Sequence, residues 1–256
     1  MKKKVDIIAS CYNEEDNIFP FYSEAKKYLK DKKYTYNIVY VDDGSTDKTY
    51  ERVLELNKKN TKEKNIQISC ISFIHNFGHE PAMCAGLEKS NADYMIFMDV
   101  DLQNPPKKIP EILEKFEQGA DCVLLRRVKY ESATIVKKLT SNGYYLFSKY
   151  ILRNSNERNV SDFFAIDRSV AKRVKNNYKT TLRFIRSFVQ KEAKNIMFVE
   201  YKNGVRNSGV SRYNYIKLTK LAIISELSRS KILRDKYKAT KDNPIYIINK
   251  KESFYA

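Results

Sequence analysis

The sequence predicts an α/β fold in which helices flank a mostly parallel β-sheet. Short apolar runs recur along the first half of the chain, and most are followed by a stretch with the spacing of an amphipathic helix. A run that is apolar at nearly every position is typical of a strand buried on both faces, as in a parallel sheet. Polar residues cluster where these runs end. Strands that alternate with helices in this way form right-handed βαβ units.

The elements expected in the first half follow one another closely. The first helix, for example, carries one apolar stripe, formed by Ile18, Phe21, Tyr22, Ala25, Tyr28 and Leu29. The expected strands are 5–9, 36–41, 67–74, 94–98 and 121–125, and the expected helices are near 18–29, after Thr46, near 81–91 and near 109–116.

Polar clusters at 12–16, 42–47, 75–80 and 99–104 follow four of the expected strands. Ligands of open parallel sheets bind outside the carboxyl ends of the strands, so these clusters predict a binding site at that edge. Within the second cluster, Gly44 permits a tight turn, and Ser45 or Thr46 can cap the next helix.

Asp99 and Asp101 come directly after the apolar run 94–98. Side chains two residues apart on a strand point the same way, so the two carboxylates are presented together, and Gln103 continues the alternation. Hard oxygen ligands at a strand end suit a divalent cation that also holds substrate phosphates. The alternative is a solvated acidic turn before a helix.

The pattern changes after residue 125. A helix near 132–151 is either a core-packing helix or a basic amphipathic helix lying on a membrane surface. The residues 206–213 are either a flexible basic loop or a phosphate-binding loop with two arginines. The other expected elements are a strand at 161–166 that carries Asp162, a helix around 182–189, a strand at 196–201, a helix at 214–230 and, from about 235, a polar tail that is at most partly ordered.

Charge is distributed unevenly along the chain. The net charge is +17, but residues 1–125 carry 18 basic and 21 acidic side chains, whereas residues 126–256 carry 30 basic and 10 acidic ones. The basic half could serve an anionic membrane surface, a phosphorylated substrate or nucleic acid. Nucleic acid is disfavoured because the chain has no RNA-binding aromatic signature and no zinc-ligand spacing.

The cysteine spacing and the hydropathy of the chain give expectations about its cellular compartment. The four cysteines lie far apart in apolar contexts, which predicts buried free thiols. We expect no signal peptide, because no apolar segment follows the N-terminal lysines, and no transmembrane helix, because no apolar run is long enough. His75 and His79 are expected to be polar loop residues, without a zinc site.

Six motifs, taken in order, resemble a known group of enzymes. The chain is similar to the inverting family 2 glycosyltransferases of GT-A fold, and more narrowly to the polyprenyl-phosphate glycosyltransferases, the group that includes dolichyl-phosphate mannose synthase. The motifs are Cys-Tyr-Asn-Glu-Glu-Asp-Asn-Ile at 11–18, Val-Asp-Asp-Gly-Ser-Thr-Asp-Lys-Thr at 41–49, Asn-Phe-Gly-His-Glu-Pro-Ala at 76–82, Asp-Val-Asp-Leu-Gln-Asn-Pro-Pro at 99–106, Ser-Asp-Phe at 161–163 and Arg-Asn-Ser-Gly-Val-Ser-Arg-Tyr at 206–213.

The resemblance implies a domain organisation and a donor site. A GT-A domain would span 1–230, with a nucleotide-sugar half at 1–125, an acceptor- and membrane-facing half at 126–230 and a basic tail at 231–256. The residues implied to bind the nucleotide are Tyr12, Glu14, Asp42, Asp43 and Asp99.

The resemblance also implies a metal and an acceptor site. Asp99, Asp101 and Gln103 would bind Mg²⁺ or Mn²⁺ on the donor diphosphate, and Asp162 is the carboxylate on the acceptor side. Asp101 and Asp162 are thus the catalytic candidates. The residues implied to lie near donor or acceptor phosphate are Arg127, Arg206, Ser211 and Arg212.

The function implied is transfer of a sugar from a nucleotide-diphosphate sugar, with UDP the favoured nucleotide, to a polyprenyl phosphate. The enzyme would be a metal-dependent hexosyltransferase, cytoplasmic and peripheral on the inner face of the plasma membrane, acting in cell-envelope glycan synthesis. The alternative is a GT-A enzyme that acts on a sugar hydroxyl of a surface polysaccharide. Asp162 would be a general base for a hydroxyl acceptor, whereas a phosphate acceptor needs no strong base.

Overall fold

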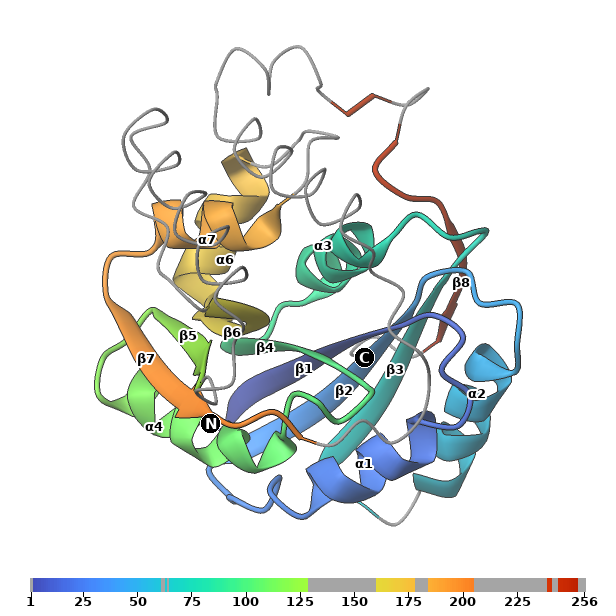
Figure 1. The fold of residues 1–256 in the computed structure, drawn as a ribbon, viewed down its shortest axis with the longest axis horizontal. Coiled ribbons are helices and arrows are strands. Elements are labelled where there is room, and N and C mark those ends of the chain that lie inside the picture. Colours follow the sequence, from blue (N-terminus) through green and yellow to red (C-terminus); the bar gives the residue numbers. More distant parts are fainter. Residues whose placement is uncertain are drawn as a thin grey trace, which may run out of the picture.

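A computed structural model describes residues 2–60, 63, 65–128, 160–177, 184–204, 239–240 and 244–252 of the chain. Within these residues, eight strands form one sheet (Figure 1). The strands are β1 (Lys3–Cys11), β2 (Tyr34–Asp42), β3 (Ile66–Phe73), β4 (Tyr94–Asp99), β5 (Cys122–Arg127), β6 (Val160–Asp167), β7 (Ile196–Tyr201) and β8 (Ile248–Glu252). Their order across the sheet is β7-β5-β6-β4-β1-β2-β3-β8.

Helices cover both faces of the sheet, which confirms the predicted α/β fold (Figure 1). One face packs against α1 (Ile18–Lys26), α2 (Thr49–Lys59) and α4 (Ile109–Glu117), and the other against α3 (His79–Lys89), α6 (Arg168–Asn177) and α7 (Ile185–Glu192). A short 3₁₀ turn, η2 (Pro106–Lys108), precedes α4.

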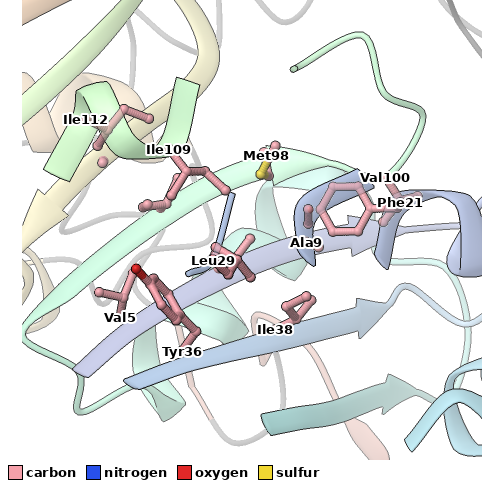
Figure 2. Close-up of a cluster of buried hydrophobic side chains, with 14 of the residues drawn as sticks. Val5, Ala9, Phe21, Leu29, Tyr36, Ile38, Met98, Val100, Ile109 and Ile112 are labelled. Carbon is pink, nitrogen blue, oxygen red and sulfur yellow. The ribbon is translucent and has the colours of Figure 1, made fainter. Parts of the chain in front are cut away.

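Two apolar cores result, one on each face. Along β1, Val5, Ile7 and Ala9 enter the first core, and Ile8 enters the second. Figure 2 shows the first core, in which strand residues such as Val5 and Ala9 gather with Phe21 of α1 and Ile109 of α4. Because both faces are buried, the central strands need apolar residues at nearly every position, which explains their continuous apolar runs.

The direction of β6 was not predictable from its composition. The strands β1, β2, β3 and β4 run parallel, as do β5 and β7. In contrast, β6 lies between β4 and β5 and is antiparallel to both. Its amino end, at Val160, therefore pairs with Arg126 near the carboxyl end of β5.

Several boundaries and elements differ from expectation. The helix expected near 81–91 begins at His79, and α6 was missed because its only buried residues, Val170, Ala171 and Val174, lie among basic side chains. The helices expected at 132–151 and 214–230 lie outside the described residues. All four cysteines are free and buried, as expected. Among the described helices, none combines the length and the apolar character needed to cross a membrane.

The polar tail contributes a strand that the sequence analysis did not expect. Strand β8 pairs antiparallel with β3 at the edge of the sheet. Just before it, the ring of Tyr246 stacks on Phe73 with centroids 5.0 Å apart, and its hydroxyl donates a hydrogen bond to Glu88 of α3. The signal was weak because the strand residues at 248–252 are mostly polar, as an edge strand permits.

We predict that the Tyr246 contacts hold the tail on the sheet. Tyr246→Ala should cost about 2 kcal/mol of unfolding free energy, a fall of roughly 4–8 °C in melting temperature, because the stacking and the hydrogen bond are both lost. Tyr246→Phe keeps the stacking and should lose about half as much. Equal melting temperatures for Tyr246→Ala and the wild type would refute this assignment.

Candidate active site

The residues predicted to carry function converge on one edge of the sheet. Ser10 of β1 pairs with Asp99 of β4, and Cys11 pairs with Asp42 of β2, so these strands end together. Because β6 runs in the opposite direction, its first residues, including Asp162, also lie at this edge. The edge thus combines the loops after β1, β2, β3 and β4 with the start of β6.

The loops after β1 and β2 are bonded to each other. Asn13, with φ of 52°, donates its N–H to Ser45 Oγ at 2.9 Å and accepts the N–H of Thr46 at 2.8 Å. Glu14 donates its N–H to Thr49 Oγ1 at 2.8 Å. The expectation that Ser45 or Thr46 caps α2 is wrong, since Asp47 Oδ1 accepts the N–H of Thr49 instead.

Asp42 and Asp43 are almost completely buried, with 1% and 3% of their surface exposed. Asp42 accepts hydrogen bonds from Ser72 Oγ at 2.8 Å and from the N–H of Ser45 at 3.0 Å. Asp43 accepts the N–H groups of Phe77 and Gly78 at 2.7 and 2.8 Å. Asp43 therefore fixes the loop after β3 in addition to facing the edge.

Burial raises the pKa of Asp43 to about 6, although the N–H groups of Phe77 and Gly78 and the nearby His79 act in the opposite direction. The carboxylate of Asp43 is therefore mostly charged at neutral pH and is held by backbone dipoles.

Gly44 allows these loops to meet. Its φ is +67°, and a Cβ there would lie 2.3 Å from the carbonyl carbon of His75. The turn predicted at Gly44 is thus required both by its conformation and by close contact with the loop after β3.

The predicted metal ligands lie at the end of β4 and on the turn that follows it, residues 99–104, named the metal turn after these predicted ligands. Asp101 Oδ1 accepts the N–H of Gln103 at 3.0 Å, and Asn104 Nδ2 donates to Asp99 Oδ2 at 3.2 Å. The side chain of Asp99 is 38% exposed, so it remains accessible. The described residues contain no cluster of three or more His, Cys, Asp or Glu side chains placed to hold a metal.

These residues nevertheless fit Mg²⁺ or Mn²⁺. Such an ion is bound through one or two carboxylates and substrate phosphates, and does not require an all-protein cage. Burial raises the pKa of Asp99, opposed by His79, and the negative charges of Asp101 and Asp162 raise it further. A cation between the donor diphosphate and these carboxylates would relieve that repulsion.

His79 is part of the edge, although the sequence favoured an ordinary loop residue. It is the first residue of α3, and its Nδ1 lies 2.8 Å from Ser10 Oγ and 3.6 Å from Asp99 Oδ1. Burial lowers the pKa of His79, but Asp99, Asp162, Glu80 and Asp43 together outweigh this and leave it raised.

Arg127 is linked to the metal turn through two side chains. Its Nε donates to the hydroxyl of Tyr201 at 2.9 Å, and that hydroxyl donates to Asn104 Oδ1 at 3.2 Å. Asn104 in turn bonds to Asp99, so Arg127 of β5 lies at the same edge.

Asp162 is paired with an arginine that the sequence analysis did not select. Nη1 of Arg186 lies 3.1 Å from Asp162 Oδ1 and donates to the carbonyl of Val160 at 2.7 Å. Burial raises the pKa of Asp162, but Arg186, His79 and Arg127 outweigh it and hold the pKa below its ordinary value. Asp162 is therefore charged at neutral pH.

The predicted phosphate ligands Arg206, Ser211 and Arg212 lie outside the described residues. The described chain reaches Gly204, whose N–H donates to the carbonyl of Gln103 at 3.0 Å. A Cβ at Gly204 would lie 2.1 Å from the carbonyl oxygen of Leu102, so β7 leads directly onto the metal turn.

The family profile described as "Glycosyl transferase family 2" matches residues 6–175. The chain belongs to this family. The match covers the loops after β1, β2 and β3, the turn after β4 and Asp162, which are the features that converge on the edge of the sheet.

Named relatives of this glycosyltransferase are similar over most of its length. It is 32% identical to a bactoprenol glucosyl transferase of Shigella phage SfV over 220 residues, which cover 86% of this chain and 70% of the relative. The same figures hold for a prophage bactoprenol glucosyl transferase homolog of Escherichia coli strain K12.

Solved structures confirm the GT-A fold of the transferase. Residues 1–349 of S. aureus TarS, in complex with UDP, match with a TM-score of 0.54 and 17% identity over 90% of this chain and 67% of that one. Glucosyl-3-phosphoglycerate synthase from Mycobacterium tuberculosis, in complex with Mn²⁺, UDP-glucose and phosphoglyceric acid, matches with a TM-score of 0.58 and 17% identity over 89% and 79% of the two chains. At these identities the likeness shows the fold alone.

The structure adds residues to the candidate site of the transferase. Besides His79, these residues are Ser10, Glu80, Asn104, Arg186 and Tyr201, and the sequence analysis assigned a site role to none of them. Only Asn104 and the pair His79-Glu80 lay within the polar clusters at strand ends, which was the available signal. Arg186 had no such signal in the sequence, because it lies on a separate helix far along the chain.

We predict that Gly44→Ala disrupts the donor-side loops. Its Cβ would collide with fixed backbone, so the variant should lose about 2–3 kcal/mol, roughly 5–10 °C in melting temperature, and exchange at the amides of Phe77 and Gly78 should accelerate. Gly119→Ala is the matched control, because Gly119 has φ of +95° but nothing within 4 Å of its added Cβ.

The Gly119→Ala control separates the cost of backbone strain at positive φ from the cost of the steric collision at residue 44. Gly119→Ala should cost about 1 kcal/mol and leave amide exchange in the 77–78 loop unchanged. If the two variants behave alike, the contact between Gly44 and His75 does not organise the loop.

Proposed function

We propose that this family 2 glycosyltransferase transfers a hexose from UDP-sugar to a polyprenyl phosphate, with inversion at the anomeric carbon. The proposal rests on one observation, which is that carboxylates from two different strands lie together at one edge of the sheet. Asp99 ends β4, and Asp162 lies near the start of the neighbouring antiparallel strand β6, where its charge raises the pKa of Asp99. A donor diphosphate and an acceptor can therefore share one site.

The names of its relatives support the lipid acceptor. The relatives that match over most of the chain include proteins called bactoprenol glucosyl transferases. The lysine- and arginine-rich second half of the chain suits an anionic acceptor at a membrane surface. We therefore place the reaction at the cytoplasmic face of the membrane, in the synthesis of cell-envelope glycans.

UDP as the donor nucleotide is supported by solved relatives of the fold. TarS was solved with UDP, and the glucosyl-3-phosphoglycerate synthase with UDP-glucose and Mn²⁺. A mannosyltransferase from Pyrobaculum calidifontis, matched with a TM-score of 0.56, was solved with GDP-mannose and Mn²⁺, so a test must include both nucleotides.

The donor side would use the loops after β1 and β2. Tyr12, Glu14, Asp42 and Asp43 lie at the strand ends where a nucleotide would bind. Asp99 and Asp101, with Gln103, would hold Mg²⁺ or Mn²⁺, which supplies charge neutralisation for the departing diphosphate.

The transfer itself requires an attack at the anomeric carbon. An oxygen of the acceptor phosphate forms the new bond to this carbon while the bond to the UDP oxygen breaks. A phosphate monoester has a second pKa near ~6 and is already mostly dianionic at pH 7, so no strong base is needed. Asp162 would orient the acceptor, and Arg127, with Arg206, Ser211 and Arg212 of the following segment, would hold phosphate.

Transfer to polyprenyl phosphate is the direct test. Purified enzyme is incubated with labelled UDP- and GDP-sugars, polyprenyl phosphate and Mg²⁺ or Mn²⁺. We expect label from one UDP-sugar to enter the organic phase and EDTA to abolish this transfer. Donor binding without transfer to the lipid would overturn the proposed acceptor and favour a sugar hydroxyl.

The size of the defect in Asp162→Asn tests its role. Because the acceptor phosphate needs no proton removed, we expect kcat to fall by about 10–50-fold while the KM for the donor stays unchanged. A fall of about 10³-fold or more would contradict the orienting role and make Asp162 a general base.

A further inference from the structure

Glu80 is a buried carboxylate that the proposed reaction does not use. It lies in the first turn of α3, and only 9% of its surface is exposed. Its Oε2 accepts the N–H of Ile185, the first residue of α7, at 2.8 Å. Phe184, which precedes α7, has no polar side chain to cap the helix. Glu80 therefore caps a helix that is more than 100 residues away in sequence.

Arg186 follows Ile185 and connects the same turn of α7 to β6. Its Nη1 donates to the carbonyl of Val160 at 2.7 Å and lies 3.1 Å from Asp162 Oδ1. Its guanidinium lies 4.8 Å from the centre of the Phe184 ring. Arg186 is mostly buried, so its direction is restricted on several sides.

From these contacts we infer that Glu80 and Arg186 are positioning residues, with Glu80 fixing the first turn of α7 so that Arg186 holds Asp162 toward the acceptor. The path runs from Glu80 to the backbone of Ile185, then to the side chain of Arg186, and then to Asp162. This inference deepens the proposed function and rests on it.

The electrostatics support the same connection. Burial raises the pKa of Glu80 to about 7, and the charge of Asp162 adds to this, whereas His79, the N–H of Ile185 and Arg186 oppose it. Asp162 Oδ1 is buried without a hydrogen bond in the described structure, so its orientation depends on the charge of Arg186. A carboxylate held in this way loses its orientation when the cation is removed.

The test measures transfer kinetics for two variants of each residue. Arg186→Met should lower kcat by about 30-fold and leave the donor KM within about threefold, because the donor loops are not touched. Arg186→Lys keeps the positive charge and should recover part of the loss, but one ammonium cannot reproduce the guanidinium fork. Arg186→Met should still bind UDP in calorimetry, which shows that it is folded.

Glu80 is tested by separating the hydrogen bond from the charge. Glu80→Gln retains an oxygen that accepts the Ile185 N–H, and it should keep kcat within about threefold of the wild type. Glu80→Leu leaves that N–H without a partner and should lower kcat by about 10-fold, with an unchanged donor KM.

Arg168→Met is the control for the loss of an arginine that binds both backbone carbonyls and a carboxylate. Arg168 also binds backbone carbonyls, of Asn91 and Ala92, and lies 3.1 Å from the carboxylate of Asp93. It is at the end of β6 away from Asp162. This variant should keep the wild-type kcat.

A double-mutant cycle decides whether Arg186 acts through Asp162. If it does, Arg186→Met combined with Asp162→Asn should be no slower than Asp162→Asn alone. Provided that the wild type transfers sugar, two results would overturn this inference. One is a double mutant whose kcat falls by the product of the two single-mutant losses, and the other is an equal kcat for Glu80→Gln and Glu80→Leu. Absence of transfer by the wild type would instead overturn the proposed function.

Discussion

The reversed direction of β6 is the constraint on which the candidate site depends. A parallel strand between β4 and β5 would present its carboxyl end at this edge and take residues 160–162 to the opposite one. Because β6 is antiparallel to both neighbours, its amino end meets the carboxyl ends of β1, β4 and β5. The loops proposed to bind the donor then follow the parallel strands, and Asp162, proposed for the acceptor side, comes from the reversed one. One sheet edge can thus hold both partners of a transfer reaction.

The carboxylates at this edge are compensated to different degrees. Asp42 is held by Ser72 and the N–H of Ser45, and Asp43 by two N–H groups. Asp162 has Arg186 beside it. Asp99 accepts hydrogen bonds from Ser10 and Asn104, and burial raises its pKa, opposed by His79 and reinforced by the charges of Asp101 and Asp162. Asp99 therefore carries a repulsion from neighbouring carboxylates that a bound cation would relieve.

The sequence predicted those features that depend on local pattern. Continuous apolar runs identified the central strands, and their polar ends located Asp43 and Asp99, because burial on both faces and strand polarity are readable from neighbouring residues. The pairing of Arg186 with Asp162 joins elements far apart in the chain, so no local pattern carries it. The strand β8 was missed for a different reason, since an edge strand needs little apolar character.

The second half of the chain is attached to the metal turn at two points. The hydroxyl of Tyr201 in β7 bonds to Asn104, and the N–H of Gly204 bonds to the carbonyl of Gln103. Only glycine fits at 204, because any Cβ would collide with the carbonyl of Leu102, itself held at φ of +65°. Arg206 follows Gly204 by two residues, so the segment proposed to bind phosphate begins from a point fixed to the turn that carries Asp99 and Asp101. The turn after β4 and the end of β7 are therefore fixed to each other, and we expect a substitution in one to act on the other through these contacts.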